Sequence, residues 1–349
     1  MVEGSRRQFR LGRCLGRGGF GEVYLATMRS PGGLDTIVAV KILRDDLRMD
    51  PGAVRRLRDE GRMLSRVRHP SLVHVFDLTR LDGRVGLVTE YVEGDDLEGC
   101  LRPPDPISHR AVIQAIGIVA AGLAMAVTTR GADGEPLEIV HRDVKPSNIR
   151  IGRHGQVKLL DFGIARFTGT ERESETVSDV VVGSVPYVAP ERLCERSSLP
   201  AGDVFGLGCC LFEGIAGEPL HLDRSLRAVS ALYLDADRYE AWLADRLDRL
   251  RLPDPTLRAL VGGMLAHDPS RRPEAGEVAR TCEVLGEVSS GPGLRRWGGD
   301  RRTWPAVGVP GPLEGLTLIE GELSIDEVET DEDGPKLIPI GPIDGPKRI

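Results

Sequence analysis

A change of pattern along the chain is the strongest constraint on its fold. Residues 9–43 alternate or run apolar between glycines, which is typical of β-strands. Residues 51–68 then carry apolar side chains at helical spacing, and two more strand-like runs follow. Beyond them, most apolar segments have helical spacing. We therefore predict an α+β fold of two lobes: a small β-rich N-lobe with one main helix (residues 9–92) and a larger, mostly helical C-lobe (residues 93–286).

The last part of the chain has a different composition. Residues 287–349 contain 11 glycines and 8 prolines, a level typical of low-complexity or disordered chain. Residues 313–349 hold ten acidic and three basic residues, which accounts for the whole formal net charge of −7. We therefore predict a disordered tail over residues 287–349. Its acidity suits a basic partner surface, and an inert linker is the alternative.

The overall composition narrows the class of protein. A net charge of −7 argues against nucleic-acid binding by bulk positive charge. The six cysteines show no CxxC pairing and the polar N-terminus lacks a secretory segment, so we expect reduced thiols and a cytoplasmic location. The longest apolar run, residues 111–127, is short for a membrane span, and we expect a buried helix rather than a transmembrane segment. The sequence does not define the oligomeric state.

A glycine-rich stretch lies between the first two strand-like segments. Gly16, Gly18 and Gly21 have the spacing that lets backbone N–H groups approach phosphate oxygens without obstruction by Cβ. A strand beginning at Val23 follows them, rather than the helix that a Rossmann site requires. Taken alone, the pattern also fits an ordinary glycine-rich hairpin.

Lysine is rare in this chain, with five lysines among 46 basic residues. A lysine retained among so many arginines indicates a site that needs a compact ammonium group. Lys41 ends an apolar strand, and Glu60 in the following helix is its expected carboxylate partner. Asp59 is the alternative, although it lies about 100° further round the helix. The alternative is that Lys41 is an ordinary surface lysine with no carboxylate partner.

The most informative segment is HRDVKPSN at residues 141–148, which DFG follows at residues 161–163. Asp143, Lys145 and Asn148 fall in one expected loop, and Asp161 follows the next hairpin. Phosphoryl transfer needs such a set: a carboxylate for a hydroxyl proton, a cation for the moving phosphate and oxygen ligands for Mg²⁺. The segment therefore indicates phosphoryl transfer.

With these motifs, residues 9–286 resemble a eukaryotic-type protein kinase domain of the kind that bacteria use as Ser/Thr kinases. The resemblance implies a two-lobed kinase fold, ATP as the donor, and Mg²⁺ or Mn²⁺ as the metal. It also implies protein substrates with Ser or Thr acceptors, because Lys145 stands where this form of the family has it. A pseudokinase scaffold that binds partners without catalysis is the main alternative. A small-molecule kinase is a second one, although it should lack the segment Gly183–Glu191.

The resemblance assigns roles to single residues. Asp143 is expected to be the catalytic base and Lys145 to steady the γ-phosphate. Lys41, paired with Glu60, would contact the α- and β-phosphates. The other implied contacts are Asn148 and Asp161 for the metal, Gly16, Gly18 and Gly21 for the phosphates, Val23 and Ala39 for adenine, Thr89 as gatekeeper, and the backbone of Glu90 and Val92 for the base.

The resemblance extends to the loops around the site. Arg272 is expected to form a structural ion pair with Glu191, and Ser184 stands where the family usually has Thr. Arg142, next to the expected base, implies an activation segment that is ordered by phosphate. We predict autophosphorylation at Thr176 and Ser178, whereas a merely Ser/Thr-rich loop is the alternative. One departure from the family is Arg150, which falls where relatives have an apolar floor under the adenine.

Overall fold

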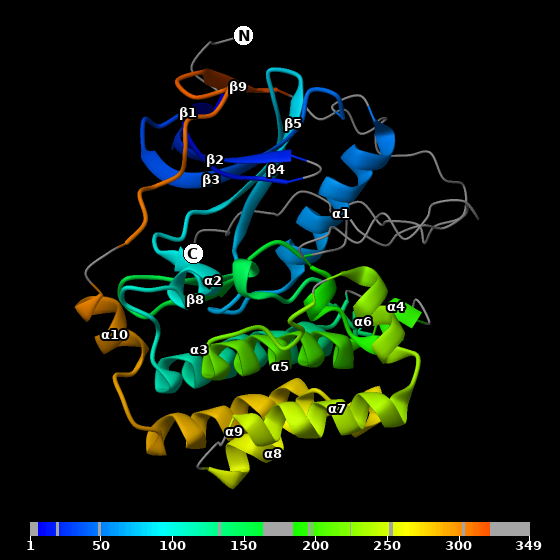
Figure 1. The fold of residues 1–349 in the computed structure, drawn as a ribbon. Coiled ribbons are helices and arrows are strands. Elements are labelled where there is room, and N and C mark those ends of the chain that lie inside the picture. Colours follow the sequence, from blue (N-terminus) through cyan, green and yellow to red (C-terminus); the bar gives the residue numbers. More distant parts are fainter. Residues whose placement is uncertain are drawn as a thin grey trace, which may run out of the picture.

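The computed structural model describes residues 6–18, 21–47, 50–131, 134–162, 184–194, 197, 199–223, 225–250, 254–301 and 304–321. In this part of the chain a β-rich lobe stacks on a helical lobe (Figure 1). The α+β, two-lobed architecture predicted from the sequence is confirmed.

The N-lobe is an antiparallel sheet that closes on itself, in the order β1-β2-β3-β5-β4-β9. Alternating side chains of these strands fill the interior of the barrel, among them Phe9, Tyr24 and Val40, which are fully buried. Its strands are β1 (Gln8–Arg17), β2 (Gly21–Arg29), β3 (Asp35–Leu43), β4 (Val75–Leu81), β5 (Arg84–Glu90) and β9 (Thr317–Gly321).

The helix of this lobe, α1 (Pro51–Arg66), packs on the sheet and carries Glu60. It begins at Pro51 because the Asp50 carboxylate accepts a hydrogen bond from Gly52 N at 2.8 Å. Leu57 and Leu64 lie on its buried face. Helical periodicity puts Glu60 on that same face, which directs its carboxylate toward β3.

The C-lobe is built around two apolar helices, α3 (His109–Thr128) and α5 (Pro200–Ala216), which pack on each other. Within the described residues, α3 is the one helix long and apolar enough to cross a membrane. It packs against α5 and α9, as expected for a buried core helix. The other helices are α2 (Leu97–Cys100), α4 (Pro190–Cys194), α6 (Leu226–Tyr233), α7 (Ala236–Arg249), α8 (Pro255–Met264), α9 (Ala275–Val288) and α10 (Leu294–Asp300).

A small three-stranded sheet between the lobes carries the polar motifs. It consists of β6 (Asp95–Asp96), β7 (Ile149–Ile151) and β8 (Val157–Leu159), in that order. Leu160 N, just after β8, donates a hydrogen bond to Asn148 O just before β7, at 2.8 Å. This bond places Asp161 beside the segment that holds Asp143 and Asn148.

The prediction of a disordered tail from residue 287 is wrong for residues 287–321. α10 packs on the C-lobe with Leu294 and Trp297 buried, and β9 pairs with β1 and β4 to complete the sheet of the N-lobe. The N-lobe therefore includes a strand from beyond its predicted boundary. The chain passes from one lobe to the other in between (orange in Figure 1). Residues 322–349 lie outside the described residues.

The composition of this segment serves close packing. A Cβ on Gly311 would lie 2.7 Å from the ring of Tyr24, and Gly308 has a φ of +61°, a left-handed conformation that favours glycine. The acidic character is also partly used within the fold, because Glu320 forms an ion pair with Arg7. Glycine and acidic residues here reflect packing and pairing, not lack of structure.

Candidate active site

A cleft of about 530 Å³ lies between the lobes and is lined by residues of both. Most of the residues that the sequence singled out for nucleotide or metal binding line it. They are Gly16, Val23, Ala39, Lys41, Glu60, Thr89, Glu90, Val92 and Asp161. The cleft is within the size range of small-molecule sites.

Lys41, Glu60 and Asp161 form a charged cluster in the cleft. The Lys41 ammonium lies 2.9 Å from both carboxylate oxygens of Glu60 and 3.2 Å from Oδ1 of Asp161. Glu60 is only 2% exposed. Lys41 therefore pairs with Glu60 and links the N-lobe to the segment that follows β8.

Opposite effects set the charge of this cluster. Burial opposes the charge of Lys41, but the carboxylates of Asp161 and Glu60 outweigh it and raise the pKa of Lys41 above its usual value. Lys41 in turn lowers the pKa of Asp161, whereas burial raises the pKa of Glu60. Near neutral pH the cluster keeps a protonated lysine beside an ionised Asp161, which is half exposed to the cleft.

Asp143, Lys145 and Asn148 form a second polar cluster. The side-chain amide of Asn148 donates to Asp143 O at 2.8 Å and to its Oδ2 at 3.0 Å. The Lys145 ammonium lies 2.9 Å from Asp143 Oδ2 and donates to Ser184 Oγ at 2.9 Å. The three residues predicted to act together are thus in contact, and Ser184 provides the hydroxyl at the position where the family has Thr.

Helix α5 holds the backbone segment that leads to Asp143. The buried carboxylate of Asp203 accepts hydrogen bonds from His141 N at 2.6 Å and Arg142 N at 2.8 Å. His141 Nε2 donates a hydrogen bond to Leu160 O at 2.9 Å, and the imidazole ring lies against Phe162. Burial lowers the pKa of His141. The histidine is therefore a neutral packing group that joins the two motif segments, rather than a proton carrier.

Two residues of the site have strained backbone. Arg142 has a φ of +70° and Asp161 a φ of +49°, in the left-handed region that is uncommon for residues with a Cβ. Such conformations are typical of active sites, because the surrounding contacts hold a side chain where relaxed backbone would not.

The opposite end of the cleft is formed by β5 and the segment after it. Ala39 pairs with Thr89 across β3 and β5, and Val92 lies just beyond. Arg150 lines the cleft, as expected from its position, and its Nε donates to Val92 O at 3.2 Å. The guanidinium is thereby held against the backbone, while the stem can cover a flat ligand from below.

The glycines of the first motif have two different roles. A Cβ on Gly16 would find no heavy atom within 4 Å, so protein packing does not require glycine there, and the open space suits a ligand that approaches the backbone. A Cβ on Gly21 would lie 2.5 Å from Ile42 O, so Gly21 is required by its contact with β3. Gly18 N donates a hydrogen bond to Gly21 O at 2.9 Å.

The expected metal ligands fit a divalent ion that also binds phosphate. Within the described residues, no group of three or more His, Cys, Asp and Glu forms a metal site. Mg²⁺ in such enzymes is held by one or two protein oxygens together with phosphates and water. Asn148 and Asp161 can supply these oxygens, because the Asn148 amide nitrogen is engaged with Asp143 and its oxygen is left for a cation.

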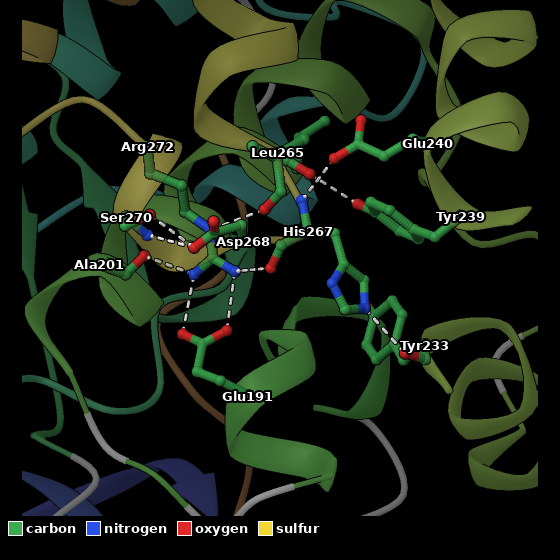
Figure 2. Close-up of polar contacts among 11 residues, drawn as sticks. Glu191, Ala201, Tyr233, Tyr239, Glu240, Leu265, His267, Asp268, Ser270 and Arg272 are labelled. Atoms are coloured by element: carbon green, nitrogen blue, oxygen red, sulfur yellow. Dashed lines mark hydrogen bonds and ion pairs between the residues drawn. The ribbon is translucent and has the colours of Figure 1, made fainter. Parts of the chain in front are cut away.

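Glu191 and Arg272 form the expected structural pair. Figure 2 shows the guanidinium facing the carboxylate, with hydrogen bonds of 2.8 and 2.7 Å. Arg272 also donates to the carbonyl oxygens of Ala266, Ala201 and His267. The pair joins α4 to the segment between α8 and α9, away from the charged clusters of the cleft.

Residues of the C-terminal segment line the cleft as well, and the sequence did not point to them. Pro305, Ala306, Gly308 and Val309 belong to its lining. The available signal was aromatic content: two of the three tryptophans, Trp297 and Trp304, lie in the supposed tail, and disordered segments are poor in aromatic residues. The predicted autophosphorylation positions Thr176 and Ser178 lie outside the described residues, as does Gly183.

Comparisons with known proteins agree with this geometry. A family model for the protein kinase domain matches residues 9–282. PknB of Mycolicibacterium smegmatis, named a serine/threonine-protein kinase, is 36% identical over 234 residues, which cover 66% of this chain and 36% of that protein. PknB of Mycobacterium tuberculosis is 34% identical over 275 residues, 76% of this chain and 40% of that protein.

A third relative carries a different name. MasK of Myxococcus xanthus, named a tyrosine-protein kinase, is 32% identical over 291 residues, 80% of this chain and 43% of that protein. The chain thus spans about two fifths of the length of the curated relatives that it matches.

Proposed function

Because this chain belongs to the protein kinase family, we propose that it transfers the γ-phosphate of ATP to Ser and Thr hydroxyls of proteins. One observation carries the proposal: the Lys41 cluster and the Asp143 cluster are both assembled, and the bond from Leu160 N to Asn148 O places them side by side. A pseudokinase scaffold would not need both sets of charged groups in contact.

The residues of the site suit in-line transfer by positioning and charge stabilisation. ATP would supply the phosphoryl group, and the side-chain oxygens of Asn148 and Asp161 would hold Mg²⁺, which would supply positive charge to the phosphates. Lys41, held by Glu60, orients the α- and β-phosphates. Lys145 steadies the γ-phosphate, and the Asp143 carboxylate accepts the proton of the attacking hydroxyl.

Ser and Thr are favoured over Tyr as acceptors. Of the three relatives described above, the two PknB proteins are named serine/threonine-protein kinases and MasK is named a tyrosine-protein kinase. The contact of Lys145 with Ser184 supports Ser and Thr as the acceptors. It brings Lys145, the lysine found in the Ser/Thr form of the kinase family, to the loop that would position the acceptor peptide.

Incorporation of label from [γ-³²P]ATP tests the proposal. The wild-type chain is compared with Asp143→Ala and Lys41→Met, with Mg²⁺ and a generic protein substrate, and labelled residues are identified by phosphoamino-acid analysis. We expect phosphoserine and phosphothreonine from the wild type and a loss of at least 100-fold in both variants, on the scale of general acid–base and charge effects. Equal labelling of all three proteins would refute catalysis, and phosphotyrosine alone would refute the substrate class.

Autophosphorylation of the activation segment is part of the same proposal. Arg142 supports it, since the side chain lies next to the expected base and lines a small cavity with Ser184 and Arg192. Mass spectrometry of the wild type after incubation with ATP and Mg²⁺ should find phosphate at Thr176 or Ser178, and none in Asp143→Ala. Phosphate confined to other segments would contradict this assignment.

A cytoplasmic location is also proposed. All six cysteines are free and five of them are buried, as in proteins of reducing compartments. Fractionation of cells that express the full chain tests this, and recovery of the protein with the membrane would refute it.

A further inference from the structure

The chain crosses between the lobes a second time after α10. We call residues 301–321 the strap, of which the structure describes 301 and 304–321. It leaves the C-lobe at Arg301 and ends as β9 in the sheet of the N-lobe (Figure 1), and residues of its middle part line the cleft.

The start of the strap is fixed beside the cleft. The Arg301 guanidinium forms a buried ion pair with Asp95 at 2.9 Å and lies over the rings of Trp297 and Trp304. Asp95 itself lines the cleft. The indole of Trp297 donates to Pro106 O at 3.1 Å, which holds α10 on the C-lobe.

The other end is fixed to β1 and β2. Val309 and Cys14 exchange two backbone hydrogen bonds, of 2.8 and 2.9 Å. Further along, Gly311 packs on Tyr24 and Leu313 joins the apolar core of the N-lobe. The residue after Cys14 is Leu15, which lines the cleft together with Gly16.

Neither attachment is on β3, which carries Lys41: Cys14 is on β1, which β2 separates from β3, and Asp95 is on β6, beyond the end of β5. Asp95 follows directly on the segment of Glu90 and Val92, and Cys14 precedes the glycine motif. Between them, Pro305, Ala306 and Val309 face the cleft. Val309 is 57% exposed although it lies on a cleft wall. Apolar side chains in such a position are poised to be covered by a ligand.

We propose that the strap is part of the nucleotide site, in which Pro305, Ala306 and Val309 contact the nucleoside of ATP. The inference rests on the proposed function, because it takes ATP as the ligand of this cleft. It assigns to the strap a share of the affinity that comes from the nucleoside and not from the phosphates, whose contacts are assigned to Lys41, Lys145 and the metal at Asn148 and Asp161.

The strap offers a matched pair of substitutions in the full chain. Val309→Ala combined with Ala306→Gly removes apolar groups from the cleft wall while keeping the backbone bonds to Cys14. Val307→Ala is the control, because Val307 is 41% exposed, lies on the same segment and does not line the cleft. Ala306→Trp is a second test variant, which adds bulk at the mouth and leaves the attachments in place.

Calorimetric titration with ATP, adenosine and inorganic tripolyphosphate separates the two ends of the site. The double variant removes three methyl groups, which a ligand in the cleft would cover only in part. We therefore expect adenosine and ATP to bind about threefold to tenfold more weakly. Tripolyphosphate should bind as to the wild type. In kinase assays KM for ATP should rise by the same factor with kcat unchanged, and Val307→Ala should match the wild type.

The outcomes distinguish this inference from the proposed function. Unchanged binding of adenosine to both test variants, or an equal loss of adenosine and tripolyphosphate binding, would overturn the role of the strap and leave the kinase proposal standing. A wild-type chain that binds neither ATP nor adenosine would overturn both.

Discussion

Replacement of Arg272 by alanine is expected to destabilise the C-lobe strongly. The Arg272 side chain is fully buried and Glu191 is 3% exposed, and two hydrogen bonds join them (Figure 2). Removal of the guanidinium leaves the Glu191 carboxylate buried without its partner, a change that costs about 3–5 kcal/mol in comparable ion pairs. The carbonyl oxygens of Ala266, Ala201 and His267 lose a donor as well. The loss is a large fraction of the 5–15 kcal/mol typical of whole domains.

Urea unfolding of the full chain at pH 7 measures this loss, and the neighbouring arginine provides the control. Arg271 is 66% exposed and lies 3.8 Å from Glu240, so Arg271→Ala should cost no more than about 1 kcal/mol. If Arg272→Ala does not fold, Arg272→Lys is measured instead, because lysine keeps the charge and loses the two-pronged contact. Equal unfolding free energies for the Arg271 and Arg272 variants would refute the reasoning.

Two further predictions concern the cleft and the response to pH. Glu60→Gln should lower kcat/KM for ATP at least tenfold, about 1.4 kcal/mol, because Lys41 loses the negative charge of its buried partner. The control Asp59→Asn, one position away on the same helix, should have the kcat/KM of the wild type. Equal effects of the two substitutions would contradict the pairing of Lys41 with Glu60. His221 has its pKa lowered to about 4 by burial and by Arg246. Since the unfolded chain then binds more protons between about pH 6.5 and pH 4, stability should fall as pH falls, by about 2 kcal/mol from pH 8 to pH 5. In urea unfolding at a series of pH values, the unfolding free energy of His221→Gln should not show this decrease with falling pH, whereas that of the surface variant His154→Gln should. An equal pH dependence of both variants would contradict the role of His221.

The two charged clusters could be predicted from the sequence because most of their residues lie close together in the chain or are joined by one simple element. Helical spacing alone favoured Glu60 over Asp59 as the partner of Lys41. Asp143, Lys145 and Asn148 lie within six residues of chain, so any loop keeps them close. The position of Asp161 needed one additional element, the hairpin of β7 and β8, whose turn signal is visible in the sequence. The family motif supplied the roles, which spacing could not.

The strap could not be predicted from the sequence, because its contacts are with residues far away in the chain. Its contacts join residues about 300 positions apart, such as Cys14 with Val309 and Arg7 with Glu320. Strand β9 is five residues long, and no local pattern distinguishes so short a strand from a linker. Glycine and proline content then favoured disorder, although here Gly308 and Gly311 are what lets the chain lie close to Cys14 and Tyr24.

The strap also bears on how the cleft can open. The lobes are connected by the segment around Val92, which follows β5, and by the strap, which is attached at Asp95 on one side and at Cys14 on the other. A rotation of one lobe against the other about the first connection must therefore carry the strap along or break one of its two attachments. The Arg301–Asp95 pair is buried, whereas the Val309–Cys14 bridge is an isolated pair outside the named strands, so we expect the bridge to open first. Opening at the bridge would withdraw Val309 from the cleft wall. Access to the cleft would then depend on the same residue that is proposed to contact the nucleoside.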